Sequence, residues 1–151
     1  MYMTQKKKSN IKKWAENLIE EVYSEWKTKY SFWKRGFIVF DSPVIYRPKL
    51  LIISLNPGGD EESFQDDLQK FKGGDFSVPK KNSYVITDWK ISKQIRDVFE
   101  GNLDILKTSV VTRVLFFRSE REKYWEINNS EKTRLAMEKF SYDKVQEIIG
   151  Y

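Results

Sequence analysis

The sequence KLLIISLNPGGD, residues 49–60, joins a run of aliphatic residues to a turn made of Asn56, Pro57, Gly58 and Gly59. A nearly continuous apolar run bounded by turn residues is typical of a strand that is buried on both faces. Such strands belong mostly to parallel sheets that helices cover on both sides. Open α/β sheets bind their ligands at the carboxyl ends of these strands. We therefore expect a functional site at this turn.

Helical patterns lie on both sides of the predicted strand. Apolar residues recur at helical spacing from Asn10 to Lys29, and Asn10 is the expected N-cap of that helix. After the turn, acidic residues suit the positive end of a helix dipole, and the helix that they open should bury Phe64 and end at Gly73. The segment Phe37–Tyr46 fits either a small hairpin or an extended segment that lines the site, and both alternatives stay open.

A second strand is predicted within Lys107–Glu120, KTSVVTRVLFFRSE, because this segment is rich in β-branched and aromatic residues. A helix should precede it, with Thr87 as its N-cap and Gly101 at its end. The order of strand, helices and strand indicates a right-handed parallel crossover. Beyond the second strand, two separate helical segments are expected, at Ser130–Phe140 and at Tyr142–Ile149.

These elements predict one α/β domain over residues 1–151, a three-layer α/β/α arrangement around a small, mainly parallel sheet. The chain contains no cysteine and no histidine. This composition excludes disulfides, thiolate nucleophiles and triads that use imidazole as the base, and we expect neither a metal nor another cofactor. The sequence has no secretory leader and no apolar run that could span a bilayer, so we expect a cytoplasmic protein without membrane contact.

The charge of the chain is compatible with a polyanionic partner. The formal net charge is +5 and the sequence pI is about 9.2. Part of the positive excess forms a basic head on the helical region of residues 1–30. Its members are Lys6, Lys7, Lys8, Lys12 and Lys13. Such a head fits either contact with DNA or simple solvation of a helix end.

Three features of the chain resemble the uracil-DNA glycosylase superfamily. LIISLNPGGD is similar to the strand and Asn-Pro-Gly turn of the mismatch-specific uracil and thymine glycosylases. An aromatic and proline-containing lead-in at Phe40–Pro48 precedes it, and TSVVTRVLFFRSE at Thr108–Glu120 resembles the second-strand segment of the family. The resemblance covers roughly Phe37 to Arg118. It implies a base-excision enzyme that hydrolyses the bond between a flipped base and its deoxyribose.

The resemblance also implies roles for the residues of the turn. Asn56 stands where the family positions the attacking water. An amide orients water but accepts no proton, which favours a slow enzyme or an activated leaving base. Pro57, Gly58 and Gly59 would let the backbone approach the base and present N–H donors to it.

Base stacking and DNA contact are assigned in the same way. Tyr46 and Phe64 are the expected stacking rings, although Phe64 by itself fits a core position better. Ser109 stands where the family often has an asparagine that reads the base. Four basic residues are expected to contact DNA phosphates: Lys80, Lys81, Arg113 and Arg118.

The chain departs from the family in its later part. It lacks the histidine of the loop that stabilises the leaving base, and it ends near the point where a third strand would begin. The resemblance therefore implies an incomplete glycosylase-like fold with an open edge along the second strand, where another copy or another protein would pair. Two alternatives to an active enzyme remain. One is a non-catalytic glycosylase-like domain that binds DNA or a protein, and the other is an unrelated α/β domain in which Asn-Pro-Gly-Gly is an ordinary turn.

Overall fold

The structure is a computed structural model that describes residues 2–119, 125 and 129–151, with the backbone alone for residues 2–9. The first helix, α1 (Tyr2–Glu25), continues into a π-helical turn, η1 (Trp26–Tyr30). Asn10 lies inside α1, so its prediction as the N-cap is wrong, because the Lys- and Gln-containing segment before it has good helix propensity. The side chains of Lys6, Lys7 and Lys8 in the basic head lie outside the described residues.

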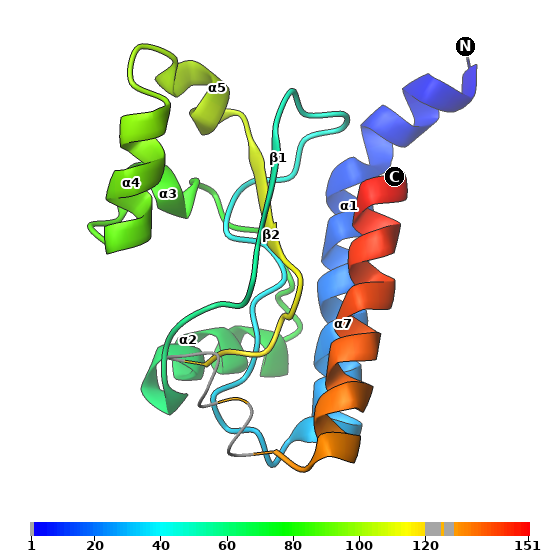
Figure 1. The fold of residues 1–151 in the computed structure, drawn as a ribbon. Helices are drawn as coiled ribbons and strands as arrows, with labels where there is room; N and C mark the ends of the chain where they lie inside the picture. The colour runs from blue at the N-terminus through cyan, green and yellow to red at the C-terminus, as the bar shows by residue number, and fades with distance from the viewer. Residues whose placement is uncertain (1, 120–124, 126–128) are drawn as a thin grey trace.

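Two parallel strands form the sheet of the described residues (Figure 1). They are β1 (Leu51–Ser54) and β2 (Val110–Arg113). The register runs from Leu51 opposite Val110 to Ser54 opposite Arg113. The predicted small parallel sheet and the mixed α/β class are therefore confirmed.

Residues 37–41 decide between the two alternatives for the segment before β1. Phe40 forms an isolated antiparallel bridge with Thr112 in β2, and Phe37 forms another with Phe117 just beyond β2. These bridges place the segment along the edge of β2 that β1 does not occupy. The segment is therefore extended and is not one arm of a hairpin.

Helices lie on both faces of the sheet (Figure 1). α1 and α7 run side by side on one face, and α3, α4 and α5 lie on the other. The bounds are α3 (Ser83–Ile86), α4 (Lys90–Val98), α5 (Leu103–Lys107) and α7 (Glu131–Gly150). Neighbouring side chains of β2 point to opposite layers: Val110 packs into the cluster of α1 and α7, and Val111 packs against Tyr84 and Leu106 of α3 and α5.

Two predicted helix boundaries are wrong for identifiable reasons. Thr87 does not open α4, because its hydroxyl donates back to the carbonyl of Ser83 at 2.8 Å and ends α3. The last two helical segments are one helix, α7, because Ser141 does not interrupt it. The buried Ser141 hydroxyl accepts a hydrogen bond from the Phe116 N–H at 3.2 Å, which gives this polar group a partner inside the protein.

The strand β1 is not buried on both faces, contrary to the prediction. Ile53 is 37% exposed and Leu55, just past the strand, is 52% exposed, whereas every residue of β2 is buried. Among the described residues, no segment pairs with the outer edge of β1. The open edge thus belongs to β1 and not to the second strand, because residues 37–41 cover that edge of β2.

The helix after the turn forms as predicted. α2 (Glu61–Lys72) begins after Asp60, whose carboxylate accepts a hydrogen bond from the Ser63 N–H at 3.0 Å in a capping box. Gly73 caps its other end. α2 lies near the carboxyl end of β1 (Figure 1).

No helix in the described part of the chain is long and apolar enough to cross a membrane.

Candidate functional site

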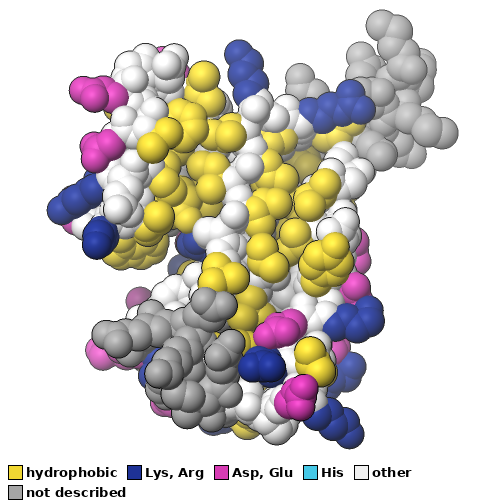
Figure 2. Space-filling view, viewed as in Figure 1, with side chains coloured by type: hydrophobic (Ala, Val, Ile, Leu, Met, Phe, Trp, Pro, Cys, Tyr) yellow, Lys and Arg dark blue, Asp and Glu magenta, His cyan; other side chains and the backbone are white. Residues whose placement is uncertain are grey.

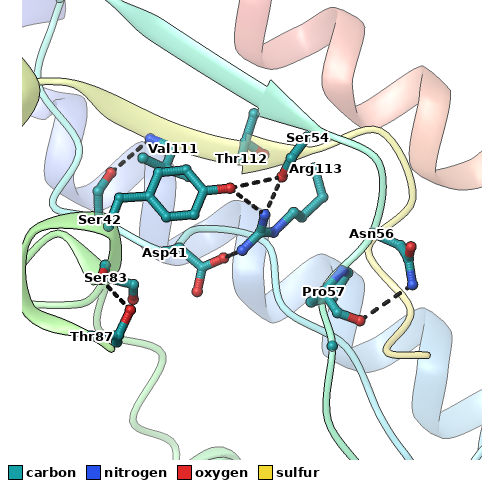
Figure 3. A network of polar contacts seen from close by, with 12 residues as sticks. Asp41, Ser42, Ser54, Asn56, Pro57, Ser83, Thr87, Val111, Thr112 and Arg113 are labelled. Atoms are coloured by element: carbon teal, nitrogen blue, oxygen red, sulfur yellow. Dashed lines mark hydrogen bonds and ion pairs between the residues drawn. The ribbon is translucent and has the colours of Figure 1, made fainter. Parts of the chain in front are cut away.

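Asn56 lies just beyond the carboxyl end of β1, where the turn meets the chain that leaves β2. Its Nδ2 donates to the carbonyl oxygen of Pro57 at 3.3 Å (Figure 3). It also donates to the carbonyl oxygen of Ser119 at 3.2 Å. The N–H of Ser119 donates in turn to the carbonyl of Pro57 at 2.8 Å. Two loops thus hold the amide group in one orientation. Its Oδ1 accepts no hydrogen bond from the described residues and remains available to a water or a ligand.

A cavity of about 360 Å³ opens beside this amide, between the carboxyl ends of the strands and α7. We call it the Asn56 cavity. Its residues are Leu55, Asn56, Val114, Leu115, Trp125, Glu138, Lys139 and Tyr142. Ligand sites of small molecules have this character, with apolar walls and a few polar groups, and typical volumes begin at about 300 Å³.

Glu138 is a residue of this cavity that sequence analysis missed. One of its carboxylate oxygens accepts a hydrogen bond from the indole Nε1 of Trp125 at 3.2 Å and lies 3.7 Å from Nε of Arg134. Glu138 and Tyr142 are four residues apart and share a face of α7. That spacing was the available signal, but the predicted break at Ser141 separated the two residues, and no local pattern places α7 beside Asn56.

Arg118 is buried beneath the turn and contacts it from the protein interior. It is therefore not on the surface where a DNA phosphate could reach it, contrary to its predicted role. Its guanidinium donates to the carbonyl of Gly58 at 3.3 Å and pairs with Asp67 of α2 at 3.1 Å. Burial lowers the pKa of Arg118, and the nearby Asp67 carboxylate acts in the opposite direction. Gly59 adopts a φ of +110°, and a Cβ there would lie 2.9 Å from Nη1 of Arg118. The positive φ therefore favours glycine at this position, and a Cβ there would also press on the guanidinium.

Arg113 also has a structural role in place of the predicted phosphate contact. Its guanidinium forms an ion pair with Asp41 and donates to the hydroxyl of Ser54 (Figure 3). It also donates to the Tyr84 hydroxyl at 2.8 Å. Burial, with a smaller effect of the Arg118 charge, lowers the pKa of Arg113 to about 10. The side chain stays charged at neutral pH and fastens the extended segment, both strands and α3 together.

Phe64 is a core residue and not a stacking ring of the site. It is fully buried, and its ring packs edge-on against Trp26 at a centroid distance of 5.2 Å. Gly36 approaches it so closely that a Cβ there would lie 2.2 Å from the ring. A flipped base would have to displace this packing, so the predicted stacking role is wrong.

Tyr46 and Ser109 lie at the amino ends of the strands, and Asn56 lies at their carboxyl ends. Each precedes a strand, whereas Asn56 follows one, and the strands are parallel. Ser109 is buried and donates to the carbonyl of Leu106 at 2.7 Å, while the Tyr46 ring meets Tyr151 edge-on at 6.2 Å. A strand of four residues separates these two ends of the sheet by about 13 Å. Neither residue belongs to the Asn56 cavity.

Lys80 and Lys81 are exposed in the segment between α2 and α3. Lys80 lines a different cavity, of about 540 Å³, where its neighbours include Asp41, Asp67, Lys70 and Asp75. The two lysines thus stay available to DNA, but the structure does not bring them into the Asn56 cavity. No group of three acidic, histidine or cysteine side chains with metal-site geometry occurs among the described residues.

Comparison with models of protein families, with curated proteins and with solved structures finds no match to this chain.

Proposed function

We propose that the chain is a hydrolase of the uracil-DNA glycosylase type, which takes a single flipped nucleobase into the Asn56 cavity. One observation carries the proposal: the Asn56 amide is fixed beside an apolar cavity at the carboxyl end of β1, and its Oδ1 accepts no hydrogen bond from the residues that the structure describes. This is the position at which open α/β sheets bind ligands. The volume of the cavity is sufficient for one base and its sugar.

The polar groups of the cavity suit hydrolysis of an N-glycosidic bond. Asn56 Oδ1 would accept a hydrogen bond from the attacking water and orient its oxygen towards the sugar carbon. Glu138 supplies the proton acceptor that an amide cannot be, and the indole of Trp125 fixes its carboxylate. As the water oxygen bonds to the sugar carbon, the bond to the base breaks and its electron pair leaves with the base.

The walls of the cavity suit a planar heterocycle. Tyr142 is 55% exposed on α7 and presents an aromatic ring at this site, which replaces Tyr46 and Phe64 as the proposed stacking residue. Lys139 lies at the same site and forms an ion pair with Asp143 at 2.6 Å. Lys80 and Lys81 remain proposed contacts to DNA phosphates outside the cavity.

The test is an excision assay on labelled DNA. Single-stranded and duplex oligonucleotides that contain uracil or an alkylated base, and duplexes that contain a thymine mismatch, are incubated with the protein. Abasic sites are then cleaved with alkali. We expect cleavage with the wild type and a loss of about 100-fold or more with Asn56→Ala and with Glu138→Gln. Asn17→Ala and Glu20→Gln change exposed residues of α1 in the same way and should retain the wild-type rate. Absence of product from every substrate at stoichiometric protein would refute the proposal.

A non-catalytic domain that binds DNA is the second candidate. It is favoured by the fact that the residue directly after β1, Asn56, carries an amide, which accepts no proton. In that case the same oligonucleotides would bind without cleavage, and their affinity would fall as the salt concentration rises. Asn56→Ala would then weaken binding to a DNA that contains an unpaired base but not to a fully paired duplex.

A further inference from the structure

A further cavity opens at the amino ends of the strands, at the end of the sheet away from Asn56. Its volume is about 420 Å³. The end of α7 lies beside α1 there (Figure 1). Both helices and the segment before β1 contribute to its wall, which includes Ile11, Trp14, Arg47, Pro48, Ile149 and Tyr151. We call it the Arg47 cavity. None of its residues belongs to the Asn56 cavity.

Arg47 has the one charged side chain among the described residues that line this cavity. Its guanidinium carbon lies 5.5 Å from the centre of the Tyr46 ring, a cation–π arrangement that holds the cation without neutralising it. Arg47 is exposed, and no carboxylate among the described residues forms an ion pair with it. The cavity therefore presents an unpaired guanidinium beside apolar walls, which suits a ligand with an anionic group.

The backbone of Arg47 is strained. Its φ is +50°, and among the described residues it is the single non-glycine residue with a positive φ. The Cβ of an ordinary side chain makes this region unfavourable, and the following Pro48 further restricts the residue before it to extended conformations. Strained residues of this kind are concentrated at ligand-binding and active sites. The bend by itself would favour glycine, so an arginine here points to a function of the side chain.

Aromatic rings continue the wall of the cavity from Arg47. Trp14 of α1 stacks on Tyr151 at a centroid distance of 4.1 Å, with an angle of 20° between the rings. Tyr151 in turn meets the Tyr46 ring edge-on at 6.2 Å. Trp14 and Tyr151 both line the cavity and are only half-buried, so part of each ring remains accessible. Nucleic-acid bases stack on such rings whatever their sequence, because every base has a π-face.

Further basic side chains surround the cavity. Lys12, Lys13 and Lys49 are exposed, and each is next in sequence to a residue that lines it. Lys12 lies 3.8 Å from a carboxylate oxygen of Glu16, whereas Lys13 and Lys49 form no ion pair with the described residues. Figure 2 shows Lys and Arg side chains beside hydrophobic ones at the top of the molecule, where Figure 1 places the amino ends of the strands. Basic groups next to aromatic rings are the combination that binds single-stranded nucleic acid.

We propose that the Arg47 cavity binds one nucleotide of a single-stranded nucleic acid. The base would stack against the pair of Trp14 and Tyr151, and the guanidinium of Arg47 would donate two hydrogen bonds to the adjoining phosphate. Lys13 and Lys49 would neutralise neighbouring phosphates of the strand. The cavity volume is sufficient for one base. Binding at this site does not depend on the proposed hydrolase function.

The test is the fluorescence anisotropy of labelled octathymidylate, titrated with the full chain to about 0.1 mM protein in about 50 mM salt, conditions that detect binding as weak as ordinary non-specific contact. We expect saturable binding by the wild type. Arg47→Gln should raise the dissociation constant at least about tenfold, because it removes a charged hydrogen-bond donor. It should also reduce the slope of log affinity against log salt by about 0.7, the contribution of one phosphate contact on a single strand.

Two control variants separate a local contact from general charge and from unfolding. Lys93→Gln removes one charge from an exposed residue of α4 and should change the dissociation constant by less than about threefold. Arg47→Gly should weaken binding as much as Arg47→Gln, yet it should unfold at a higher urea concentration than Arg47→Gln, since glycine adopts the positive φ without strain. Circular dichroism of both Arg47 variants should match the wild type, because the side chain is exposed.

Two further probes test the stacking and the kind of ligand. An abasic octamer with the same phosphates should bind at least about tenfold more weakly than octathymidylate, because it has no base to stack. Thymidine monophosphate lacks the neighbouring phosphates and should displace the octamer only at a concentration about 100-fold higher or more.

Three results would each overturn the proposal: no binding by the wild type throughout the titration, equal binding of the abasic octamer, or an Arg47→Gln variant that binds as Lys93→Gln does. Displacement by thymidine monophosphate at a nucleotide concentration equal to that of the octamer would overturn the assignment to a strand.

Discussion

Replacement of Arg113 by methionine should destabilise the fold strongly, because Arg113 and Asp41 form a buried ion pair. Their side chains are 7% and 6% exposed, respectively. Arg113→Met keeps an unbranched apolar stem close to that of arginine and removes the guanidinium. Asp41 would then keep its buried position without the counter-charge, and the hydroxyls of Ser54 and Tyr84 would each lose the hydrogen bond that Arg113 donates.

The expected loss in the free energy of unfolding follows from the buried charge that remains without its partner. Removal of one partner of a buried ion pair costs about 3–5 kcal/mol, because the remaining charge stays desolvated. Asp41→Leu should cost a similar amount, because it leaves the guanidinium buried. Replacement of both partners by apolar side chains is often neutral or stabilising, so the double variant should lie within about 1–2 kcal/mol of the wild type. The two single effects should thus be strongly non-additive.

Urea unfolding followed by tryptophan fluorescence and circular dichroism measures these differences as shifts of the midpoint at constant slope. Lys81→Met is the matched control, because Lys81 is exposed, and it should change the free energy of unfolding by less than about 0.5 kcal/mol. Single variants that each lose less than about 1 kcal/mol would refute the reasoning, since the pair would then be solvated. A double variant no more stable than the singles would refute the pairing of Arg113 with Asp41.

Two further predictions concern glycines with positive φ and the N-cap of α2. Gly36→Ala should lower the free energy of unfolding by about 3 kcal/mol in the same urea assay, because φ is +66° and the new Cβ would lie 2.2 Å from the Phe64 ring. Gly74→Ala is its control: φ there is +80° but the Cβ would meet open space, so this variant should lose only about 1 kcal/mol. Hydrogen bonds from the backbone and hydroxyl of Ser63 lower the pKa of Asp60 below its ordinary 3.8. The folded form thus binds this proton less readily than the unfolded form, and the stability that the Asp60 cap contributes is present above pH 4 and lost as the pH falls below that value. Asp60→Ala should therefore unfold at lower urea than the wild type at pH 7 but approach it in acid, and equal differences at pH 7 and pH 3 would contradict this role.

The local sequence determined the elements whose signals are themselves local. The aliphatic run before the turn contains β1, and the β-branched run contains β2, because such side chains suit a pleated and partly buried strand. Asp60 and Gly73 bound α2 as expected, since both caps act within three or four residues of the chain. Asn56 reached the carboxyl edge of the sheet for the same reason: it follows its strand directly.

The tertiary structure alone decided which of the predicted site residues meet. Because the strands are parallel, Tyr46 and Ser109 lie at the amino ends of the strands, away from Asn56. Glu138 of α7 lies at the carboxyl ends, in the same cavity as Asn56. A short sequence window contains neither of these distances, because they depend on how distant segments pack.

Long-range contacts also decided where the two arginines lie. Arg113 pairs with Asp41, which precedes it by 72 residues, and Arg118 pairs with Asp67, which precedes it by 51 residues. Sequence shows an arginine near a strand end, but only the folded chain shows whether a carboxylate or the solvent meets it. A buried guanidinium needs such a partner because its desolvation is unfavourable, and the fold therefore placed both arginines in its interior and not on a DNA-binding surface.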